Sequence, residues 1–431
     1  MEFLFKEWQD IWIPELKERE LEVKISEKVR KIITFTGIRR SGKTYMMFQF
    51  IKQLSENVPK ENIFYINFED ERIEKTKESL THLIPTLMKL YGNSDKQYFL
   101  FLDEIQIMPD WSQWLRRVYD SYRNINFVVS GSSSKLSSRE IPTELRGRAL
   151  NYEILPLSFI EFLKFKGIEL EKHFEHSERK MSILKRELDD YIENGGFPEV
   201  VLEDPVSNKK KFVQEYFRTM ISRDMIERHN VKKVHLLNDF LKLLINSKEF
   251  SVNKSVNIFR SQGKQAGKET LINYMKYAEE SYFCFFIPIF SYKIKDQMRY
   301  SHKVYFTDNS FITNLSLRFL KNSGRFYENL VAIELIRKKT IDPMLEIYYW
   351  KNKSGEVDFV IKRGLKVKQL IQVCYDITYY DVKKREVEAL LDASKELKCN
   401  ELLVITNENE SIEYFEGKKI KFIPLWKWLL G

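Results

Sequence analysis

The chain has 431 residues, which is too long for one compact core, so we expect two or three domains. Apolar residues make up 43% of it, enough for buried cores, whereas its purely apolar runs are far too short to cross a bilayer. Lys and Arg outnumber Asp and Glu by 71 to 62, a balance that permits nucleic-acid binding and equally suits a solvated surface. We therefore expect a soluble protein with no membrane partner, whose charge alone identifies no ligand.

The N-terminal segment MEFLFKEWQDIWIPEL lacks the basic start and the small-residue cleavage site of a secretory signal. We therefore expect a cytoplasmic protein. The three cysteines, Cys284, Cys374 and Cys399, are widely spaced and form no CxxC pair. They predict neither a disulfide framework nor a zinc site, and we interpret them as small buried apolar residues.

The first predicted strand covers residues 32–36 and is followed by GIRRSGKT and then by a helix with apolar residues three to four positions apart. Strand, Gly-x-x-x-x-Gly-Lys-Thr and helix in this order are typical of a phosphate-binding loop, rather than of an ordinary strand–turn–helix. The loop would wrap phosphate with backbone N–H groups, Lys43 would reach the β- and γ-phosphates, and Thr44 would ligate Mg²⁺. The predicted nucleotide-binding residues are Gly37, Arg39, Arg40, Ser41, Gly42, Lys43, Thr44 and Tyr45.

The stretch QYFLFLDEIQ places four apolar residues directly before Asp103 and Glu104, as expected of a parallel strand buried on both faces. Its end would deliver two carboxylates to the edge of the sheet where ligands of α/β proteins bind. Asp103 would then hold Mg²⁺, and Glu104 would polarise the attacking water. The alternative is a buried strand that ends in a solvated acidic turn.

The next strand, NINFVVSGSSSKL, ends at Ser130, whose hydroxyl is predicted to sense the γ-phosphate or hold the water. Alternatively, the small residues Gly131 to Ser134 cap the following helix. In TELRGRAL, Arg146 and Arg148 are candidates for an arginine finger in the same chain or in a neighbouring one, or for surface ion pairs. The predicted catalytic residues are thus Lys43, Glu104, Ser130, Arg146 and Arg148, with Thr44 and Asp103 at the metal.

The motifs GIRRSGKT, LFLDEIQ, VVSGSSS, LRGRA followed by YEILPLSFIEFL, and NGGFPEV resemble one family. It is the family of AAA-type ATPases of archaea and bacteria that carry a nuclease-like domain of uncharacterised function at the C-terminus. The resemblance implies ATP as the nucleotide and an α/β fold with an additional-strand P-loop core, then a helical and winged-helix region and a restriction-endonuclease-like end. The implied domains are residues 1–160, 161–230, 231–310 and 311–431, and a homo-oligomer is implied as well.

Residues 159–230 are predicted to be helical, with a stop at Gly195 and Gly196, while Arg223, Asp224 and Arg228 face nucleotide, a neighbouring subunit or solvent. Residues 235–310 predict three helices and a two-stranded wing. Such a module could bind DNA phosphates or pack against protein. The candidates for DNA contact are the basic residues Lys268, Lys276, Lys293, Lys295, Arg299 and Lys303, interleaved with Tyr274 and Tyr277.

The C-terminal part predicts a helix with Glu328 and Glu334, and then a hairpin, GEVDFVIKRGLKVKQLIQVC. A metal-dependent nuclease of the implied class needs an acidic residue on such a helix, an aspartate on one strand, and a carboxylate–x–lysine on the next. Glu328 and Asp358 match, but Gln372 and Cys374 supply neither a carboxylate nor a fixed positive charge. We predict a catalytically silent domain that keeps a groove for nucleic acid or protein. The side chains that could instead complete the site are Lys362, Lys366, Lys368 and Asp376.

Three functions follow as hypotheses. The first is an ATPase that couples the nucleotide state to movement of its winged-helix and nuclease-like parts. The second is an ATP-regulated DNA- or protein-binding switch with slow hydrolysis. The third, a metal-dependent nuclease, is disfavoured by Gln372 and Cys374.

Overall fold

The computed structural model describes residues 2–11, 13–25, 28–93, 96–131, 144–316, 323–353 and 355–431. The chain forms two compact units, residues 1–155 and 156–431. The first therefore ends close to the predicted end of the ATPase core at residue 160, whereas the predicted divisions at residues 230 and 310 stay predictions. In the described residues, no helix combines the length and the apolar character that a membrane span requires.

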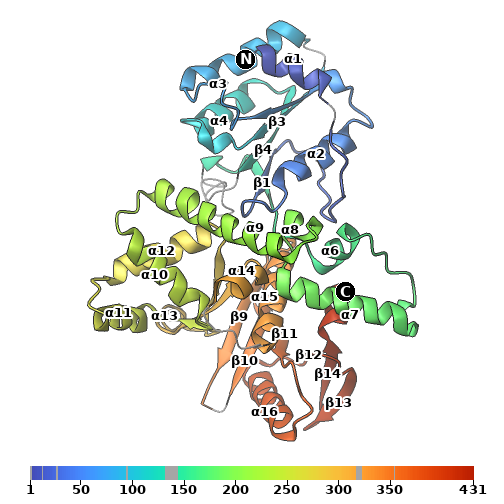
Figure 1. Ribbon diagram of the computed structural model, residues 1–431, viewed down its shortest axis with the longest axis vertical. Coiled ribbons are helices and arrows are strands. Elements are labelled where there is room, and N and C mark those ends of the chain that lie inside the picture. The colour runs from blue at the N-terminus through green and yellow to red at the C-terminus, as the bar shows by residue number, and fades with distance from the viewer. Residues whose placement is uncertain are drawn as a thin grey trace. The chain divides into compact units, whose positions relative to one another are not determined.

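The first unit contains a five-stranded sheet in the order β2-β3-β4-β1-β5, with parallel neighbours throughout and helices on both of its sides (Figure 1). Strands β1 and β3 are buried along their whole length, as their apolar sequences predicted. The strands are β1 (Ile32–Thr36), β2 (Ile63–Asn67), β3 (Tyr98–Asp103), β4 (Ile125–Gly131) and β5 (Ala149–Glu153). Strand β4 lies between β1 and β3. The predicted phosphate loop, which follows β1, and the predicted acidic pair, at the end of β3, therefore belong to strands that are separated by a single strand. This is the sheet of a P-loop NTPase, and it confirms the predicted α/β class.

Helices of the first unit present one apolar side to this sheet. In α2, Met46, Met47, Phe50 and Ile51 are buried, which confirms the predicted helical spacing. The α-helices are α1 (Glu2–Asp10), α2 (Lys43–Leu54), α3 (Lys77–Tyr91) and α4 (Trp111–Ser121), and the 3₁₀ turns are η1 (Lys60–Asn62) and η2 (Ile105–Ile107). The indole of Trp8 in α1 donates to the carbonyl of Ile63 at 2.7 Å, which fastens α1 to β2.

The second unit begins with helices, as predicted for residues 159–230. Ser158 and Glu161 form a capping box at the start of the first helix. The long helix α7 stops before Gly195, which has φ +78°, and the Gly196 N–H donates to Asp308 at 2.7 Å. The elements are α6 (Phe159–Phe165), η4 (Phe174–His176), α7 (Glu178–Asn194), α8 (Pro198–Leu202), α9 (Val206–Thr219) and the π-helical η5 (Met220–Glu227).

Three helices and a small antiparallel sheet in the order β6-β8-β7 follow. The predicted helices and the two strands of the wing are present, and the short helix α13 lies in the connection between these strands. The elements are α10 (Val234–Ile245), β6 (Glu249–Phe250), α11 (Val252–Ser261), α12 (Lys268–Glu280), β7 (Cys284–Ile287), α13 (Ile294–Arg299) and β8 (His302–Phe306). That this module is a winged helix remains a prediction.

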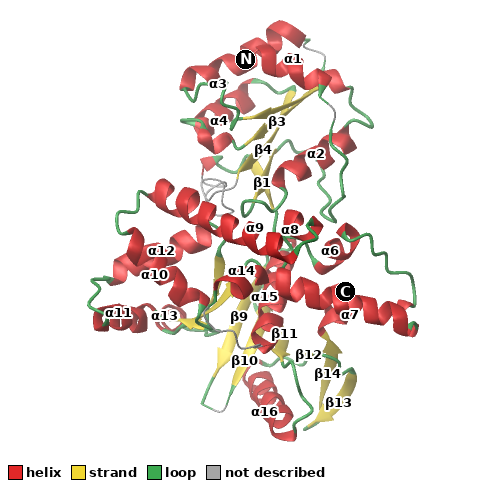
Figure 2. Cartoon of the chain, in the orientation of Figure 1, coloured by secondary structure: helices red, strands yellow, loops and turns green. Residues whose placement is uncertain are grey.

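A six-stranded mixed sheet in the order β13-β14-β12-β11-β10-β9 forms the C-terminal part (Figure 2). Strands β10 and β11 pair antiparallel, which confirms the predicted hairpin, and α16 buries Leu390 and Leu397 in the core below them. The helices are α14 (Asn309–Leu315), α15 (Ser323–Ile341), α16 (Tyr380–Leu397) and α17 (Leu425–Leu430). The strands are β9 (Leu345–Lys351), β10 (Glu356–Arg363), β11 (Lys366–Val373), β12 (Leu402–Thr406), β13 (Ser411–Phe415) and β14 (Lys418–Pro424).

Candidate active site

The loop between β1 and α2 depends on two glycines. Gly37 has φ +143°, and a Cβ at this position would lie 2.1 Å from the carbonyl oxygen of Ile154, so no other residue fits without a shift of the backbone. Gly42 has φ +92° and immediately precedes α2. The loop therefore turns sharply at both ends and brings its backbone to the N-terminus of a helix, which is the geometry that binds phosphate.

Lys43 and Thr44, the first two residues of α2, contact different elements: Lys43 contacts the loop, and Thr44 contacts the end of β3. Lys43 is 6% exposed, and its Nζ donates to the carbonyl oxygens of Gly37 and Ile38 at 3.1 and 2.9 Å. The Thr44 hydroxyl donates to Asp103 Oδ2 at 2.7 Å. The hydroxyl and the carboxylate predicted to share Mg²⁺ are thus neighbours, although they are far apart in the sequence.

Asp103, the last residue of β3, is 1% exposed. Besides Thr44, it accepts hydrogen bonds from the hydroxyls of Tyr65, at 2.8 Å, and Ser130. Burial and then the charge of Glu104 raise the pKa of Asp103, while the three hydroxyl donors act in the opposite direction. A buried carboxylate beside a second one favours a cation, and the oxygens of Thr44 and Asp103 are ligands of the hard type that Mg²⁺ prefers, so these residues fit the predicted ion.

Glu104 and Ser130 lie at the tips of β3 and β4. Glu104 has φ +52°, an uncommon conformation for this residue type, and such strain is frequent at functional sites. The Glu104 N–H donates to Ser130 Oγ at 3.3 Å, and the Gln106 amide donates to the Glu104 carboxylate. Ser130 therefore contacts both acidic residues, while Ser132, Ser133 and Ser134 lie outside the described residues.

The remaining loop residues have different surroundings. Ser41 is buried, and its hydroxyl donates to the Ile38 carbonyl at 2.9 Å. Arg39 lies 3.8 Å from Glu69, and Arg40 has φ +66°. Tyr45, the third residue of α2, is 56% exposed.

Arg148 lies at the opposite edge of the sheet from the phosphate loop. Its carbonyl accepts the N–H of Ile32 at the start of β1, while the loop follows the end of this strand, about 16 Å away at the usual rise of a strand. Its guanidinium binds both carboxylate oxygens of Asp120, at 3.0 and 2.8 Å. An arginine finger of Arg148 in the same chain is therefore wrong. Arg146 is exposed with φ +48°, and action of either arginine in a neighbouring chain stays a prediction.

Sequence reasoning missed three side chains that organise this site. Tyr65 in β2 holds Asp103, Gln106 holds Glu104, and Arg19 donates to the carbonyls of Ser41 and Leu155 at 2.9 and 3.0 Å. Tyr65 carried a weak signal, as the only residue with a hydroxyl in the apolar strand IFYIN next to the acidic strand. Arg19 carried none, because it lies in a segment without secondary structure.

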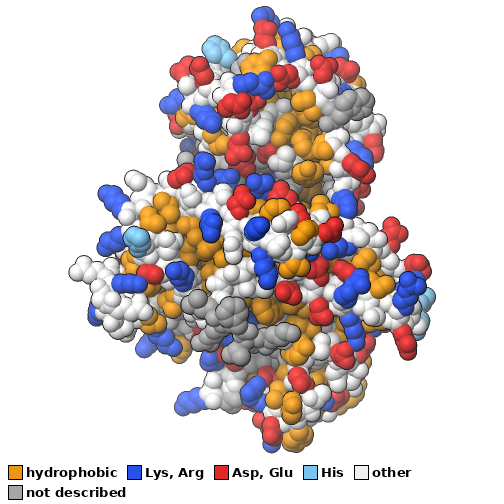
Figure 3. Space-filling model, in the orientation of Figure 1, with side chains coloured by type: hydrophobic (Ala, Val, Ile, Leu, Met, Phe, Trp, Pro, Cys, Tyr) orange, Lys and Arg blue, Asp and Glu red, His pale blue; other side chains and the backbone are white. Residues whose placement is uncertain are grey.

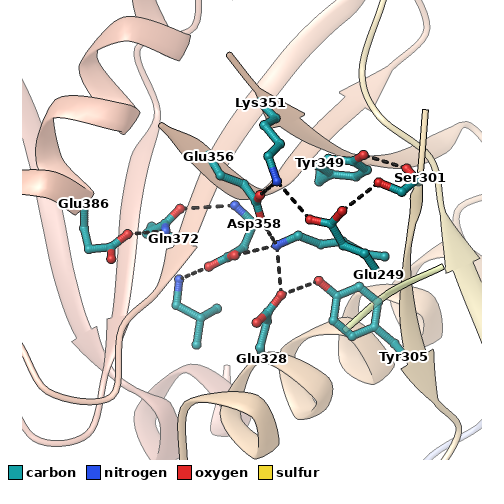
Figure 4. A network of polar contacts seen from close by, with 12 residues as sticks. Glu249, Ser301, Tyr305, Glu328, Tyr349, Lys351, Glu356, Asp358, Gln372 and Glu386 are labelled. Atoms are coloured by element: carbon teal, nitrogen blue, oxygen red, sulfur yellow. Dashed lines mark hydrogen bonds and ion pairs between the residues drawn. The ribbon is translucent and has the colours of Figure 1, made fainter. Parts of the chain in front are cut away.

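In the C-terminal part, Glu328 and Asp358 do come together, but around a lysine that sequence reasoning assigned elsewhere (Figure 4). Lys303 Nζ lies 2.9 Å from Glu328, 2.7 Å from Glu356 and 2.7 Å from Asp358. Burial opposes its charge, but these acidic neighbours raise the pKa of Lys303 well above its ordinary value, so the ammonium stays protonated. Lys303, at 4% exposed, is not a DNA contact, because its charge is buried among carboxylates.

The other residues proposed for this site lie around it. Gln372 accepts the Asp358 N–H at 3.1 Å and donates to Glu386, and burial raises the pKa of Cys374 to about 12, so its thiol is neutral. Lys362 pairs with Glu346 at 2.5 Å, and Asp376 binds the Thr378 hydroxyl at 2.6 Å, so neither completes the cluster. Glu334 pairs with Arg337 at 3.1 Å instead of joining Glu328. A pocket of about 560 Å³ opens over the cluster.

The predicted DNA contacts divide into exposed and buried groups. Tyr274 is buried, and the partly buried Tyr277 stacks on His229 with the ring centroids 3.7 Å apart, so both rings pack against other side chains of the protein. Asp224 is likewise buried, and Arg223 lies 3.7 Å from Glu227. The exposed basic residues are Lys268, Lys276, Lys293, Lys295 and Arg299.

The parallel sheet, the glycine-bounded loop after β1 and the acidic pair after β3 define the first unit as a P-loop NTPase, and residues 29–163 match the family described as an AAA domain. An uncharacterized protein of Methanocaldococcus jannaschii, MJ1544, is 38% identical over 421 residues, which cover 96% of this chain and 90% of that protein. The chain belongs to the family of that protein. An uncharacterized protein of Haemophilus influenzae is 27% identical over 349 residues, covering 80% of this chain and 83% of that one.

Two further segments match domains of unknown function, DUF8612 over residues 185–322 and DUF4143 over residues 323–428. Neither description names a nuclease, so the restriction-endonuclease-like end stays a prediction. Among solved structures, Orc1 of Aeropyrum pernix in complex with DNA is 11% identical, with 66% of this chain and 85% of that chain covered and a TM-score of 0.33. Cdc6p of Pyrobaculum aerophilum is 11% identical, with 79% and 92% covered and a TM-score of 0.29.

Proposed function

We propose that the first unit binds ATP with Mg²⁺ and hydrolyses its β–γ bond. One observation carries the proposal, namely the 2.7 Å hydrogen bond between the Thr44 hydroxyl and Asp103, which joins the phosphate-binding loop to the acidic strand end. In P-loop NTPases a Ser or Thr of the loop and an Asp of this strand hold the metal ion together. The two residues that this chemistry requires are already in contact.

Each residue of the site has a role in the proposed reaction. Lys43, which now contacts the loop carbonyls, would bind the β- and γ-phosphates. Thr44 and Asp103 would hold Mg²⁺, which when bound would neutralise charge on the phosphate oxygens. Glu104 orients the attacking water and accepts its proton as a general base. Ser130, which contacts both acidic residues, would hold them in a fixed position relative to the γ-phosphate.

We further propose that a neighbouring copy of the chain completes the site. Arg148 lies at the edge of the sheet away from its own phosphate loop, and the neighbouring Gly147 accepts a hydrogen bond from Lys31 at the same edge. In a homo-oligomer, Arg146 or Arg148 would therefore act at the loop of another chain. An arginine from a neighbouring chain stabilises negative charge in the transition state and accelerates hydrolysis strongly. The resulting change at the nucleotide would drive movement of the second unit.

The experiment compares ATP binding and hydrolysis for the wild type, Lys43→Ala and Glu104→Gln. Lys43→Ala should lose ATP binding. Glu104→Gln should bind ATP as tightly as the wild type, but its rate of hydrolysis should be lower by a factor of about a hundred or more. Lys52→Ala is the matched control, because Lys52 lies in the same helix and pairs with Glu18 at 3.1 Å on the surface. Normal hydrolysis by Glu104→Gln would remove this carboxylate from the mechanism.

The connection between β7 and β8 favours DNA as a partner of the second unit. Lys293, Lys295 and Arg299 are exposed there beside Tyr292 and Tyr300, which are 79% and 53% exposed. Cations bind phosphates, and exposed aromatic rings can stack on bases. On the face seen in Figure 3, basic and acidic side chains are interspersed, so this local group would have to supply the affinity.

This second proposal is tested by DNA binding at several salt concentrations. Lys293→Ala/Lys295→Ala should weaken binding and reduce the slope of log K against log salt by about 2, one for each lost phosphate contact. Lys366→Ala/Lys368→Ala, which removes as much charge from the exposed side of β11, is the control. Equal slopes for both double variants would exclude this connection as the DNA site.

An ATP-regulated switch, rather than a motor, would hydrolyse ATP slowly and without stimulation by DNA.

A further inference from the structure

Three carboxylates of the second unit point at a single nitrogen atom. Glu328 comes from α15, Glu356 and Asp358 come from β10, and the Lys303 ammonium from β8 lies 2.7 to 2.9 Å from an oxygen of each (Figure 4). A lysine ammonium has three N–H donors, so one donor is available for each carboxylate. All three donors of the ammonium are therefore matched by acidic oxygens.

The carboxylates are also held from behind. Glu328 accepts the Tyr305 hydroxyl at 2.6 Å, and Asp358 accepts the Val373 N–H at 2.9 Å. Glu356 binds Lys351 at 2.8 Å, and this outer lysine also pairs with Glu249. These second contacts fix the orientation of each acidic group, as outer contacts do around metal ligands.

The lysine has no freedom to leave. Its side chain is 5% exposed, and the segment that precedes it is joined to β9. The Tyr349 N–H donates to the Pro288 carbonyl at 3.1 Å, and the Phe290 N–H donates to the Tyr349 carbonyl at 2.6 Å. The Tyr349 hydroxyl donates to the Ser301 carbonyl at 2.6 Å. The small sheet and the C-terminal sheet are thus linked by backbone hydrogen bonds beside the cluster. Lys303 belongs to the region that matches one domain of unknown function, and the three acids belong to the next.

We propose that the Lys303 ammonium is a built-in cation that occupies a carboxylate site otherwise suited to a divalent metal ion and keeps metal out. Without a cation, the three carboxylates, of which Asp358 is buried and Glu328 and Glu356 are partly buried, would repel one another at close range. Their oxygens surround a nitrogen at distances that exceed those of Ca²⁺ ligands by only a few tenths of an ångström. In this protein, the site is closed to metal, and the lysine fastens the middle of the chain to its C-terminal part.

The test replaces the ammonium by an apolar group of similar length, in Lys303→Met, and measures thermal unfolding and Mn²⁺ binding without nucleotide. In EDTA the variant should unfold about 10 °C below the wild type, because charges of a buried pair are left uncompensated. Mn²⁺ should restore most of this loss, and electron paramagnetic resonance should detect about one more bound Mn²⁺ per chain than in the wild type. Lys351→Met removes only the outer lysine and should gain no Mn²⁺ site.

A second comparison serves if Lys303→Met does not fold. Lys303→Met/Asp358→Asn relieves part of the repulsion and should fold without acquiring the extra ion, and the wild type and Asp358→Asn should bind equal amounts of Mn²⁺. Two results would overturn the proposal: Mn²⁺ binding by the wild type that Asp358→Asn abolishes, or a folded Lys303→Met whose stability does not respond to Mn²⁺.

Discussion

Asp103 is a buried carboxylate that is held by side chains from three different elements. It is almost completely buried and accepts hydrogen bonds from Thr44, Tyr65 and Ser130, which come from α2, β2 and β4. Burial raises its pKa, and the hydroxyl donors offset part of that effect. Single substitutions around Asp103 should therefore weaken the proposed Mg²⁺ binding more than they lower the stability of the fold.

Removal of the Tyr65 hydroxyl tests this expectation. Tyr65→Phe keeps the ring, which packs against Trp8 and Phe48, and deletes the hydrogen bond to Asp103. Because outer contacts orient metal ligands, the Mg²⁺ concentration for half-maximal ATP hydrolysis should rise about ten-fold. ATP affinity measured without Mg²⁺ should stay unchanged. If the Mg²⁺ dependence also stays unchanged, Tyr65 only fills space.

The backbone at Gly37 gives a second prediction. In Gly37→Ala, the added Cβ meets the Ile154 carbonyl and the residue has an unfavourable φ, so the loop must shift. Strain of about 1–3 kcal/mol should lower ATP affinity about ten-fold or more. Gly267→Ala is the control, since Gly267 has φ −76° and the nearest atom to its Cβ is 3.9 Å away. Equal ATP affinity in isothermal titration calorimetry for both variants would contradict the account of the loop.

Helices of the second unit pack through aromatic rings. His229, which follows η5, stacks on Tyr277 of α12 with an angle of 11° between the rings, and Tyr274 of the same helix packs edge-on against Phe240 of α10. Burial, followed by the charges of Arg228 and Lys276, lowers the pKa of His229 to about 4. This contact between two helices should therefore weaken in acid.

The direction of this pH effect follows from the number of protons that the folded and the unfolded chain bind. Between about pH 6.5 and pH 4 the unfolded chain binds a proton at His229 and the folded chain does not, so stability falls as the pH falls. Burial raises the pKa of Asp308 to about 6, which has the opposite effect in this range, so only the difference between variants isolates His229. His229→Phe keeps the stacked ring without the charge. In urea unfolding, its stability relative to the wild type should rise from about pH 7 to about pH 4.5.

At the scale of the whole chain, local patterns were predictable and distant pairings were not. The phosphate loop, the acidic pair and the β10–β11 hairpin each occupy one continuous stretch, so their residue order was sufficient. Lys303 lies 25 residues from Glu328 and 55 residues from Asp358 in the sequence. The sequence predicted that its strand belongs to a wing with several basic residues. Its charge suggested DNA, and only the fold shows that carboxylates surround it. Arg148 and Asp120 illustrate the same point, since the pair depends on which edge of the sheet each reaches.

The most direct test of the account is the rate of ATP hydrolysis per chain for the wild type and Lys43→Ala over a series of protein dilutions. We predict hydrolysis by the wild type that Lys43→Ala abolishes, and a rate per chain that rises with protein concentration as neighbouring chains contribute an arginine. The rise should disappear when both Arg146 and Arg148 are replaced by alanine. Equal hydrolysis by the wild type and Lys43→Ala would contradict the assignment of the loop as the nucleotide site.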